Sequence, residues 1–501
     1  MKMNDIIRIL SIALSTFYAH AGTSWVVDSQ EEWEQTTSRR KGIQIDNGVA
    51  QPEVEKGAFT SRLKSYDEKK SLSSITLDQS PLWLNWEQAA NIGTKSMRDA
   101  PVLLSVGPNN YWMLGRYNSK VGGKKAKKPF TPQPATLEGF DEPLLTTAIP
   151  NEFEVADKKI KPSGGYHAWH SKDMKNWVHY GPVTDKHARW TTTAEYADGK
   201  FYIYYDFPND QDPHVYVDTD LTDGKPGEDM GMAFKDPSHG SDCGVIRGAD
   251  GKFHLIYENW DHIDASKNAW DAPVAGHAVS DTGLSDFNIL APAVDLRTKP
   301  TGKKATFIHP HWPKEDPENY ASGEAEYEIH EPEQEAFGDW AAISIGGRYY
   351  LFGDYDRKGG EPMSAAWFTS SSLDEQFTFC SNIGVGHPDP DICFAEGKFY
   401  LATQQSIDYV SDGPWVESVE VRVGVDTDND KKVDHWSEWR EVKEVYDHTP
   451  GFAKQVQKTA ASMDLSSLPA GYGFQFEVNM TDTTGNKSKP ALDKVTVSFA
   501  D

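Results

Sequence analysis

Four aspartates open similar apolar segments of the 501-residue chain: Asp99, Asp242, Asp339 and Asp389. A cluster of carboxylates suits glycoside hydrolysis, because one acid protonates the leaving oxygen while another, ionised, activates water. Close packing of like charges pushes their pKa values apart, so identical groups can take these different roles. Oxygen ligands of this kind also bind divalent cations, and the two chemistries are compatible. The structural alternative is that each acid only caps hydrogen bonds at a sheet edge.

The elements that position these acids form an internal repeat. Five segments share an apolar strand, a tight turn and an aromatic strand. Asp-Gly, Gly-Gly or Glu-Gly at several of the turns supplies the positive φ of a tight hairpin. The segments are "DAPVLLSVGPNNYWMLGRY" from Asp99, "WTTTAEYADGKFYIYYD" from Trp190, "SDCGVIRGADGKFHLIYE" from Ser241, "GDWAAISIGGRYYLFGDYD" from Gly338 and "HPDPDICFAEGKFYLATQ" from His387.

Segments with a weaker similarity to one another, such as "HAWHSKDMKNW" and "AWFTSSSLDEQF", follow some of the repeats and predict a second hairpin there. Two hairpins make a four-stranded blade, and five such units predict an all-β fold, a five-bladed β-propeller over residues 85–411. The innermost strands of a propeller converge on its axis, so the four aspartates are expected to line one funnel. A β-sandwich with similar hairpins is the alternative, but sandwiches rarely repeat the same turn chemistry so often.

The regions on either side of the repeat have a different character. Residues 22–84 are polar and charged, and we expect an N-terminal extension that wraps the propeller or helps to form a homodimer. Residues 412–501 contain alternating segments such as "WVESVEVRVGV" and "YGFQFEVNMTD", which predict a C-terminal accessory β-sandwich.

The first 21 residues are typical of a secretory signal peptide. Lys2 and Arg8 precede an apolar stretch, and Ala19-His20-Ala21 provides a small-x-small cleavage site. No cysteine follows directly, so a lipoprotein anchor is not indicated. We therefore expect a secreted or periplasmic protein.

Charge and cysteine content restrict the partners. The formal net charge of −26 argues against nucleic acid and anionic membrane surfaces, because both require a basic surface. Three cysteines in so long a chain do not form a disulfide framework. At most one bridge is expected, and Cys380–Cys393 is the nearer pair.

The segments "RDAPVLL", "SDCGVIRGADGKFHLIY" and "GDWAAISIGGRYYLF", with "SKDMKNW", resemble the five-bladed propeller glycosidases over about residues 85–410. These include families 43 and 32 and the marine anhydro-galactosidases of family 117. The resemblance implies an inverting reaction in which Asp99 is the general base, Asp242 tunes the acid and orients the substrate, and Asp339 is the acid.

The proton donor departs from the family 43 pattern. Family 43 has Glu followed by Gly-Pro at this position, whereas this chain has "FGDW". The donor therefore stays open among Asp339, Glu335 and His330, since a His is the candidate donor in the family 117 relatives. The resemblance also suggests that His387 lies near an axial ion such as calcium, although a lone His is more often simply packed.

Several cationic and aromatic residues near the segment openings are candidates for substrate binding. An anionic sugar would need guanidinium forks, and an exposed Trp can stack on a sugar ring. The alternatives are salt bridges to the acids and Trp packing in the core. The substrate-binding candidates are Arg98, Arg189, Arg247, His170 and Trp260, with Arg116, His167 and His239 as further residues of the same kind.

The segment "DTDNDKKVD" has acidic residues at the spacing of a calcium loop. Asp426, Asp428 and Asp430 are candidate metal ligands, and Asp434 follows them. Lys431 stands where such loops have Gly. A plain acidic turn is the alternative reading of this segment.

Together these features predict an exported exo-acting glycoside hydrolase without an organic cofactor. The resemblance to the marine anhydro-galactosidases implies galactan oligosaccharides of the agar or carrageenan type as substrates, with 3,6-anhydro-galactose as a candidate for the terminal sugar released. Two alternatives stay open: a non-catalytic carbohydrate-binding propeller, whose acids hold cations, and a polysaccharide lyase, for which His330 and Arg348 are the weak candidates.

Overall fold

The computed structural model describes most of the chain, in the ranges given at the end of this paragraph. The described residues fall into two compact units. Unit 1 holds residues 24–79, 416–444 and 460–500, and unit 2 holds residues 86–413 and 445–459, each within the described ranges. The described ranges are 24–79, 86–118, 130–158, 160, 165–185, 190–207, 212–238, 240–259, 271–296, 300–307, 325–330, 336–356, 363–384, 389–403, 406–413, 416, 418–482 and 490–500.

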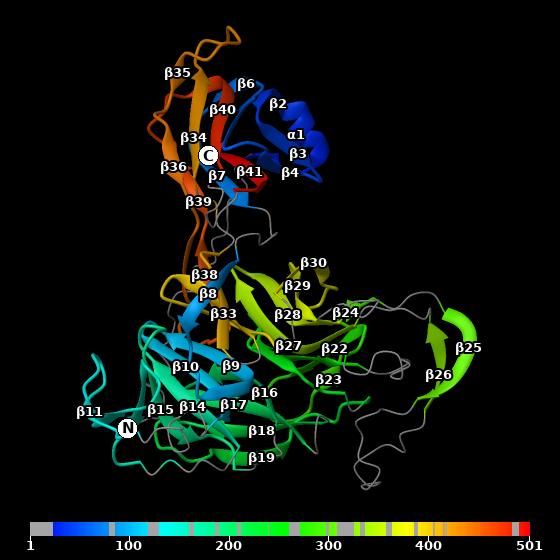
Figure 1. Ribbon diagram of the computed structural model, residues 1–501. Coiled ribbons are helices and arrows are strands. Elements are labelled where there is room, and N and C mark those ends of the chain that lie inside the picture. Colours follow the sequence, from blue (N-terminus) through cyan, green and yellow to red (C-terminus); the bar gives the residue numbers. More distant parts are fainter. Residues whose placement is uncertain are drawn as a thin grey trace, which may run out of the picture. The chain divides into compact units, whose positions relative to one another are not determined.

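The structure is nearly all β (Figure 1). Each of the five repeat segments forms an antiparallel hairpin that begins one sheet of unit 2. We name the first strands of these hairpins the ring strands: β9 (Met97–Gly107), β16 (Trp190–Ala197), β20 (Gly244–Arg247), β27 (Ala336–Ile345) and β31 (Asp391–Ala395). Their partners, the second strands, are β10 (Asn110–Tyr117), β17 (Lys200–Phe207), β21 (Phe253–Glu258), β28 (Arg348–Asp356) and β32 (Lys398–Thr403).

Further strands complete these sheets. Strand β8, which precedes the first hairpin in the chain, pairs with β33 of the last sheet. Two strands, β37 (Val445–His448) and β38 (Gln455–Thr459), extend the fourth sheet beyond its ring strand β27. The outer strands are β8 (Glu87–Ile92), β11 (Pro134–Ala135), β12 (Leu144–Thr146), β13 (Glu152–Val155), β14 (Tyr166–Ser171), β15 (Trp177–Pro182), β18 (Asp212–Asp218), β19 (Glu228–Met232), β22 (Val274–Ser280), β23 (Asn288–Ile289), β24 (Val294–Asp295), β29 (Ser364–Ser370), β30 (Thr378–Ile383) and β33 (Ser406–Ser411). Strands β25 (Pro300–Phe307) and β26 (Ala325–His330) pair only with each other among the described strands.

The ring strands contact one another in the cyclic order β9, β16, β20, β27, β31 and back to β9. Apolar cores lie between neighbouring sheets, because both faces of each sheet carry aromatic and aliphatic side chains. Trp112 of β10 packs on Phe201 of β17 with ring centroids 6.0 Å apart, and Tyr202 of β17 packs on Phe253 of β21 at 4.8 Å. These aromatic residues of the repeat therefore stabilise contacts between sheets.

Unit 1 contains two sheets that share one apolar core. Strands from both ends of the chain alternate in them: β5 pairs with β40, and β7 pairs with β41. The polar N-terminal segment therefore forms part of the same unit as the C-terminal strands. The elements are β1 (Ser24–Val27), α1 (Gln30–Thr36), β2 (Thr37–Lys41), β3 (Ile43–Asp46), β4 (Val49–Pro52), β5 (Lys56–Ser61), β6 (Lys64–Lys70), β7 (Leu72–Gln79), β34 (Val419–Asp426), β35 (His435–Trp436), β36 (Arg440–Val442), β39 (Ala461–Asp464), β40 (Gly471–Thr481) and β41 (Leu492–Phe499).

Two global features concern the described residues only. None of the helices among them is long and apolar enough to cross a membrane. The three cysteines are all free: Cys243 and Cys393 are buried and Cys380 is half-buried. The Cys380–Cys393 bridge that the sequence allowed is therefore not formed.

Candidate functional site

Three of the four aspartates that open the repeats have described side chains, and all three have a positive φ. The φ angles are 40° at Asp242, 48° at Asp339 and 35° at Asp389. A non-glycine residue is uncommon in this region, and such strain clusters at functional sites. All three carboxylates are half-buried. We call these three residues the opening acids.

Asp99 belongs to the ring strand β9, but its side chain lies outside the described residues, as does that of Arg98. The backbone of β9 nevertheless carries the same irregularity, because Ala100, the next residue, has a φ of 34°. The pairing of β9 with β10 is interrupted over the same stretch, between Val102 and Arg98. Asp99 therefore lies in the interrupted stretch of its ring strand, directly before the residue with the positive φ.

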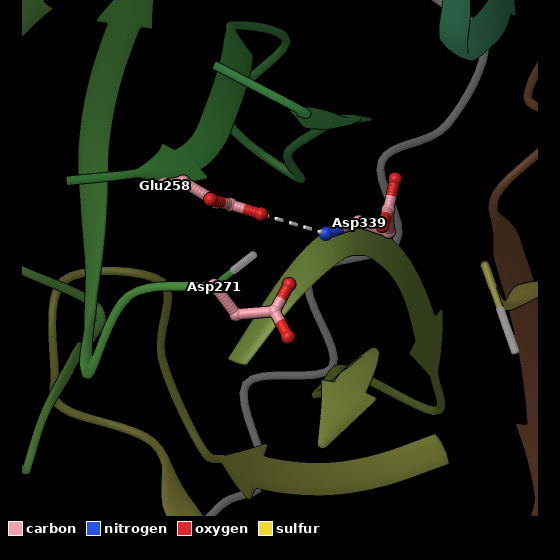
Figure 2. Close-up of side chains that lie close together, drawn as sticks. All are labelled: Glu258, Asp271 and Asp339. Carbon is pink, nitrogen blue, oxygen red and sulfur yellow. Dashed lines mark hydrogen bonds between the residues drawn. The ribbon is translucent and has the colours of Figure 1, made fainter. Parts of the chain in front are cut away.

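Behind the opening acids lie three buried carboxylates, Glu258, Asp271 and Asp354, which are 1%, 2% and 1% exposed. Figure 2 shows Glu258 and Asp271 close to Asp339, with the Glu258 carboxylate directed at the backbone nitrogen of Asp339. Carboxylate oxygens of Glu258, Asp271 and Asp339 lie within 4.8 Å of one another, and so do those of Asp339, Asp354 and Asp389. Asp339 thus belongs to both groups, each of which has the oxygen donors that a divalent cation prefers.

Gly338 makes room for this arrangement. A Cβ atom added at Gly338 would overlap the carboxylate oxygens of both Glu258 and Asp271. Only glycine leaves space for two carboxylates at this point of the backbone. The Gly of "FGDW" is therefore explained by packing, directly beside Asp339.

A repeated hydrogen bond holds the opening acids in place. Asp206 ends the hairpin of one sheet, and its Oδ2 accepts the backbone N–H of Asp242 in the next sheet at 2.9 Å. Glu258 accepts the backbone N–H of Asp339 through Oε1 at 3.3 Å (Figure 2). The backbone of Asp389 likewise hydrogen-bonds the carboxylate of Asp354.

We call Asp206, Glu258 and Asp354 the bracing acids. Each comes from a second strand and binds the opening acid of the following ring strand. All three are buried, at 0%, 1% and 1% exposure. A buried carboxylate that accepts a backbone N–H fixes the otherwise unfavourable backbone conformation of its partner. The positive φ of each opening acid thus has a specific stabilising contact.

The electrostatics of the cluster favour a proton on Asp339. Burial raises the pKa of Asp339 well above its usual range, and the neighbouring charges of Asp242, Asp389 and Asp271 raise it further. A hydrogen bond between the Asp339 and Asp389 side chains acts in the same direction. Burial and the charges of Asp339 and Asp389 also raise the pKa of Asp354. A carboxylic acid that keeps its proton near neutral pH is suited to donate it.

Sequence reasoning did not single out the bracing acids, although a signal was present. They occupy matching places at the ends of "FYIYYD", "FHLIYE" and "YYLFGD" in three of the repeats. Aligning the second strands, and not only the first, would have found them. Asp271 has no such signal, because it comes from the segment between β21 and β22.

An arginine lies close to the start of two ring strands. Arg116 of β10 is opposite Arg98 in register, and its guanidinium carbon lies 3.1 Å from the centroid of the Trp190 ring. Trp190 is the first residue of β16 and is half-buried. This cation–π pair places a buried Arg beside the first residue of β16. Its role in substrate binding stays a prediction.

Two other predicted binding residues do not lie with the acids. Arg247 is the last residue of β20, roughly 16 Å along the strand from Asp242, and it pairs with Asp198 at 3.1 Å. His170 is buried, with its ring stacked on Trp112 at 4.4 Å and Nε2 3.0 Å from Asn110 Oδ1. Both residues stabilise the ends of their sheets away from the cluster.

His167 is also buried, and its Nδ1 lies 2.9 Å from His179 Nε2. Arg348, the candidate charge neutraliser of a lyase, donates to Thr369 Oγ1 at 3.3 Å. Five further candidates of unit 2 lie outside the described residues: Arg189, His239, Trp260, Glu335 and His387. His330 ends β26, and its side chain is likewise not described.

In unit 1 the loop after β34 gathers carboxylates. Oxygens of Asp426, Asp428 and Asp434 lie within 4.8 Å of one another, whereas Asp430 pairs with Lys432 at 3.2 Å. Lys431, at the position where a calcium loop has Gly, has a φ of 72°. The backbone thus has the turn such a loop requires, and these oxygen donors fit calcium. The calcium site stays a prediction, with Asp434 replacing Asp430 in the group.

Comparisons with known proteins give a structural likeness only. No family model matches the chain, and no curated protein matches it. An α-L-arabinofuranosidase from Clostridium thermocellum is similar in structure, with a TM-score of 0.35, 12% identity, and coverage of 73% of this chain and 95% of that one.

An exo-β-1,3-galactanase from Phanerochaete chrysosporium has a TM-score of 0.36 and 10% identity, covering 82% of this chain and 100% of that one. An exo-1,5-α-L-arabinanase from a bovine ruminal metagenomic library has a TM-score of 0.36 and 12% identity, covering 63% and 91%. These structural neighbours are glycoside hydrolases. At this level of likeness, a function for the present chain has to come from its own residues.

Proposed function

We propose that unit 2 is a five-bladed β-propeller glycoside hydrolase and that unit 1 is an accessory β-sandwich. The single observation that carries the activity is Asp339, whose half-buried carboxyl group lies beside Asp242 and Asp389 and has a raised pKa. The cyclic contact order of the ring strands supports the propeller, since radial closure brings the first residues of all ring strands together.

In the proposed reaction Asp339 donates its proton to the glycosidic oxygen as the bond from that oxygen to the anomeric carbon breaks. Water attacks the anomeric carbon from the opposite face, and its proton passes to Asp99. The negative charge of Asp242 keeps the proton on Asp339 until the leaving oxygen takes it. Water forms the new bond in a single displacement, so the configuration at the anomeric carbon is inverted.

The substrate we propose is a galactan oligosaccharide. The enzyme releases one terminal sugar from it, and we propose 3,6-anhydro-galactose as that sugar. This choice rests on the resemblance of the repeat segments to the marine anhydro-galactosidases. Arg116, which stacks on Trp190 at the start of β16, is the candidate to bind an anionic or sulfated ring. The signal-like first 21 residues support export.

A product assay tests the activity. The full chain is incubated with neutral and sulfated algal galactan oligosaccharides, and with xylan and arabinan fragments, while released sugars are separated and identified. We expect a single terminal sugar from one class, with inverted configuration by NMR. Binding without any product would instead support a non-catalytic carbohydrate-binding protein, and an unsaturated product would support a lyase.

Asp339→Asn provides the matched test of the donor. Removing a general acid costs about 10²–10⁴-fold in rate. Asp281→Asn is the control, because Asp281 is an exposed acid of the same unit whose side chain is 82% exposed. Equal losses in the two variants would contradict the role of Asp339.

A further inference from the structure

A segment near the C-terminus returns to unit 2 and packs on its ring strands. Residues 445–459, which we call the cap, comprise β37, a turn and β38, and they follow β36 of unit 1 in the chain. Strand β38 pairs in parallel with the end of β27, where Ser344 is opposite Gln455. The cap thus joins a sheet far from it in sequence.

The cap contacts all five ring strands, near their ends. His448 Nδ1 lies 3.1 Å from Ser105 Oγ of β9, and its ring packs on Phe394 of β31. The backbone N–H of Ala453 donates to Glu195 of β16 at 3.1 Å. The remaining two contacts are Gln455 Nε2 donating to the Arg247 carbonyl of β20, and Ser344 N–H of β27 donating to the Lys454 carbonyl.

Lys454 extends from the cap into the ring. Its side chain is fully buried, and Nζ lies 2.6 Å from Asp391 Oδ1 and 3.1 Å from the Ile392 carbonyl. Asp391 is the first residue of β31 and stands two residues after the opening acid Asp389. Its Oδ2 accepts the backbone N–H of Leu103 at 2.7 Å, which joins β31 to β9.

Burial raises the pKa of both Asp391 and Glu195, and the charge of Lys454 opposes that rise in each. Removing one partner of such a buried pair leaves an uncompensated charge, which is strongly destabilising. Other titratable groups face the cap or lie in it. They include Arg247 with its partner Asp198, Cys393 on β31, Tyr111 and Glu396 beside His448, and Asp447 next to it.

We infer that the cap closes the ring at the end away from the opening acids, and that Lys454 is a positioning residue for the proposed active site. Through Asp391 it holds β31 against β9, and so fixes Asp389 relative to Asp99. Through its carbonyl it holds β27, which carries Asp339. The C-terminal region therefore supplies part of the proposed catalytic unit, and this inference deepens the proposed function.

The test uses the full chain and a readout that does not depend on hydrolysis. Denaturant midpoints and Tm are measured from pH 5 to 8 for wild type, Lys454→Met, Lys454→Arg and Lys454→Met/Asp391→Asn. Lys458→Met is the control, because Lys458 lies partly exposed on the same strand. We expect Lys454→Met to lower Tm by at least about 5 °C and the control to leave it nearly unchanged.

The pH dependence separates charge from packing. Without Lys454 the pKa values of Asp391 and Glu195 rise further, so stability falls more steeply as pH increases. Lys454→Arg keeps the charge, so its unfolding free energy should depend on pH almost as in wild type. In the double variant, Asp391→Asn removes one of the two titrating acids, so the stability should depend on pH less steeply than in Lys454→Met alone. A uniform loss at every pH would reduce Lys454 to a packing role and overturn the inference, as would a Lys454→Met variant that matches the control.

Activity then tests the positioning. The pH profile of kcat/KM is measured on any substrate that wild type hydrolyses. In Lys454→Met the acidic limb of this profile should move to higher pH, and KM should change less than kcat. An unchanged acidic limb together with a lowered Tm would contradict a positioning role for Lys454. A wild type that hydrolyses nothing would contradict the proposed function alone, because the stability slopes still decide whether Lys454 acts by charge.

Discussion

The carboxylate of Asp206 accepts the backbone N–H of Asp242 at 2.9 Å across the boundary between two sheets. Its other oxygen accepts the hydroxyl of Ser241 at 2.8 Å. One buried acid therefore fixes two consecutive residues just before a ring strand. The same relationship recurs between Glu258 and Asp339.

Replacing Asp206 tests whether bracing matters. Asp206→Ala leaves the Asp242 N–H and the Ser241 hydroxyl without these acceptors, which we expect to cost about 1–3 kcal/mol of unfolding free energy. Turnover should fall as well, because the backbone at Asp242 relaxes. Asp206→Asn keeps one acceptor oxygen, so its unfolding free energy should lie between those of wild type and Asp206→Ala. Chemical denaturation and the product assay measure both effects, with Asp281→Ala as control, and a variant as stable as that control would refute the bracing role.

Gly338 offers a steric test beside the same site. A Cβ there overlaps the carboxylates of Glu258 and Asp271, so Gly338→Ala should cost about 1–3 kcal/mol through overpacking. Gly347→Ala is the comparison, because nothing lies within 4 Å of a Cβ at that position, although its φ of 84° adds backbone strain. Denaturant midpoints report both. If Gly338→Ala is neutral, the two carboxylates are not where the structure places them.

Buried histidines predict a loss of stability in acid. Burial lowers the pKa of His277, with a contribution from His254, and that of His167, in both cases to about 4. The unfolded chain binds protons near 6.5, so it binds more protons than the folded chain between about pH 6.5 and 4, and stability falls as pH drops through that window. In urea titrations at several pH values, His277→Gln should lose less unfolding free energy between about pH 6.5 and 4 than wild type does. The same pH dependence in both proteins would contradict a lowered pKa of His277.

The loop after β34 predicts calcium binding to unit 1. Isothermal titration of the full chain with CaCl₂ should show a site that depends on this loop, with a Kd on the order of 10⁻⁴ M as in extracellular modules. Asp428→Asn and Asp434→Asn should weaken binding at least about tenfold, since each removes a charged donor of the group. Asp430→Asn should have a smaller effect, because Asp430 pairs with Lys432. The absence of binding heat, or equal effects of all three variants, would favour a plain acidic turn.

The sequence predicted the hairpins well because their signals are local. Asp198 and Gly199 have φ angles of 53° and 78°, as the Asp-Gly turn between aromatic strands requires. Asp242 and Asp339 were also predicted to lie together; burial raises the pKa of Asp339, and the charge of Asp242 raises it further. Matching positions in a repeat become neighbours once the repeats close around an axis.

Contacts between distant segments could not be predicted in this way. Lys454 meets Asp391 across 63 positions of sequence, and Val478 pairs with Phe59 across far more. No local periodicity encodes either contact, because tertiary packing sets the register. Asp271 enters the cluster from a connecting segment, and neither turn chemistry nor alternation marks it.

Asp339→Asn tests the protonated, catalytic Asp339 most directly, through its unfolding free energy at several pH values and through its rate of sugar release. Burial and like charges raise the pKa of Asp339, so the folded chain keeps a proton that the unfolded chain loses above its ordinary pKa of 3.8. Stability therefore falls as pH rises above that value, and removing the carboxylate relieves the cost.

We predict that Asp339→Asn is more stable than wild type at pH 8, with the difference shrinking toward pH 5, and that it releases sugar at least about 100-fold more slowly. A variant that is less stable at pH 8, or that turns over at the wild-type rate, would contradict a protonated, catalytic Asp339.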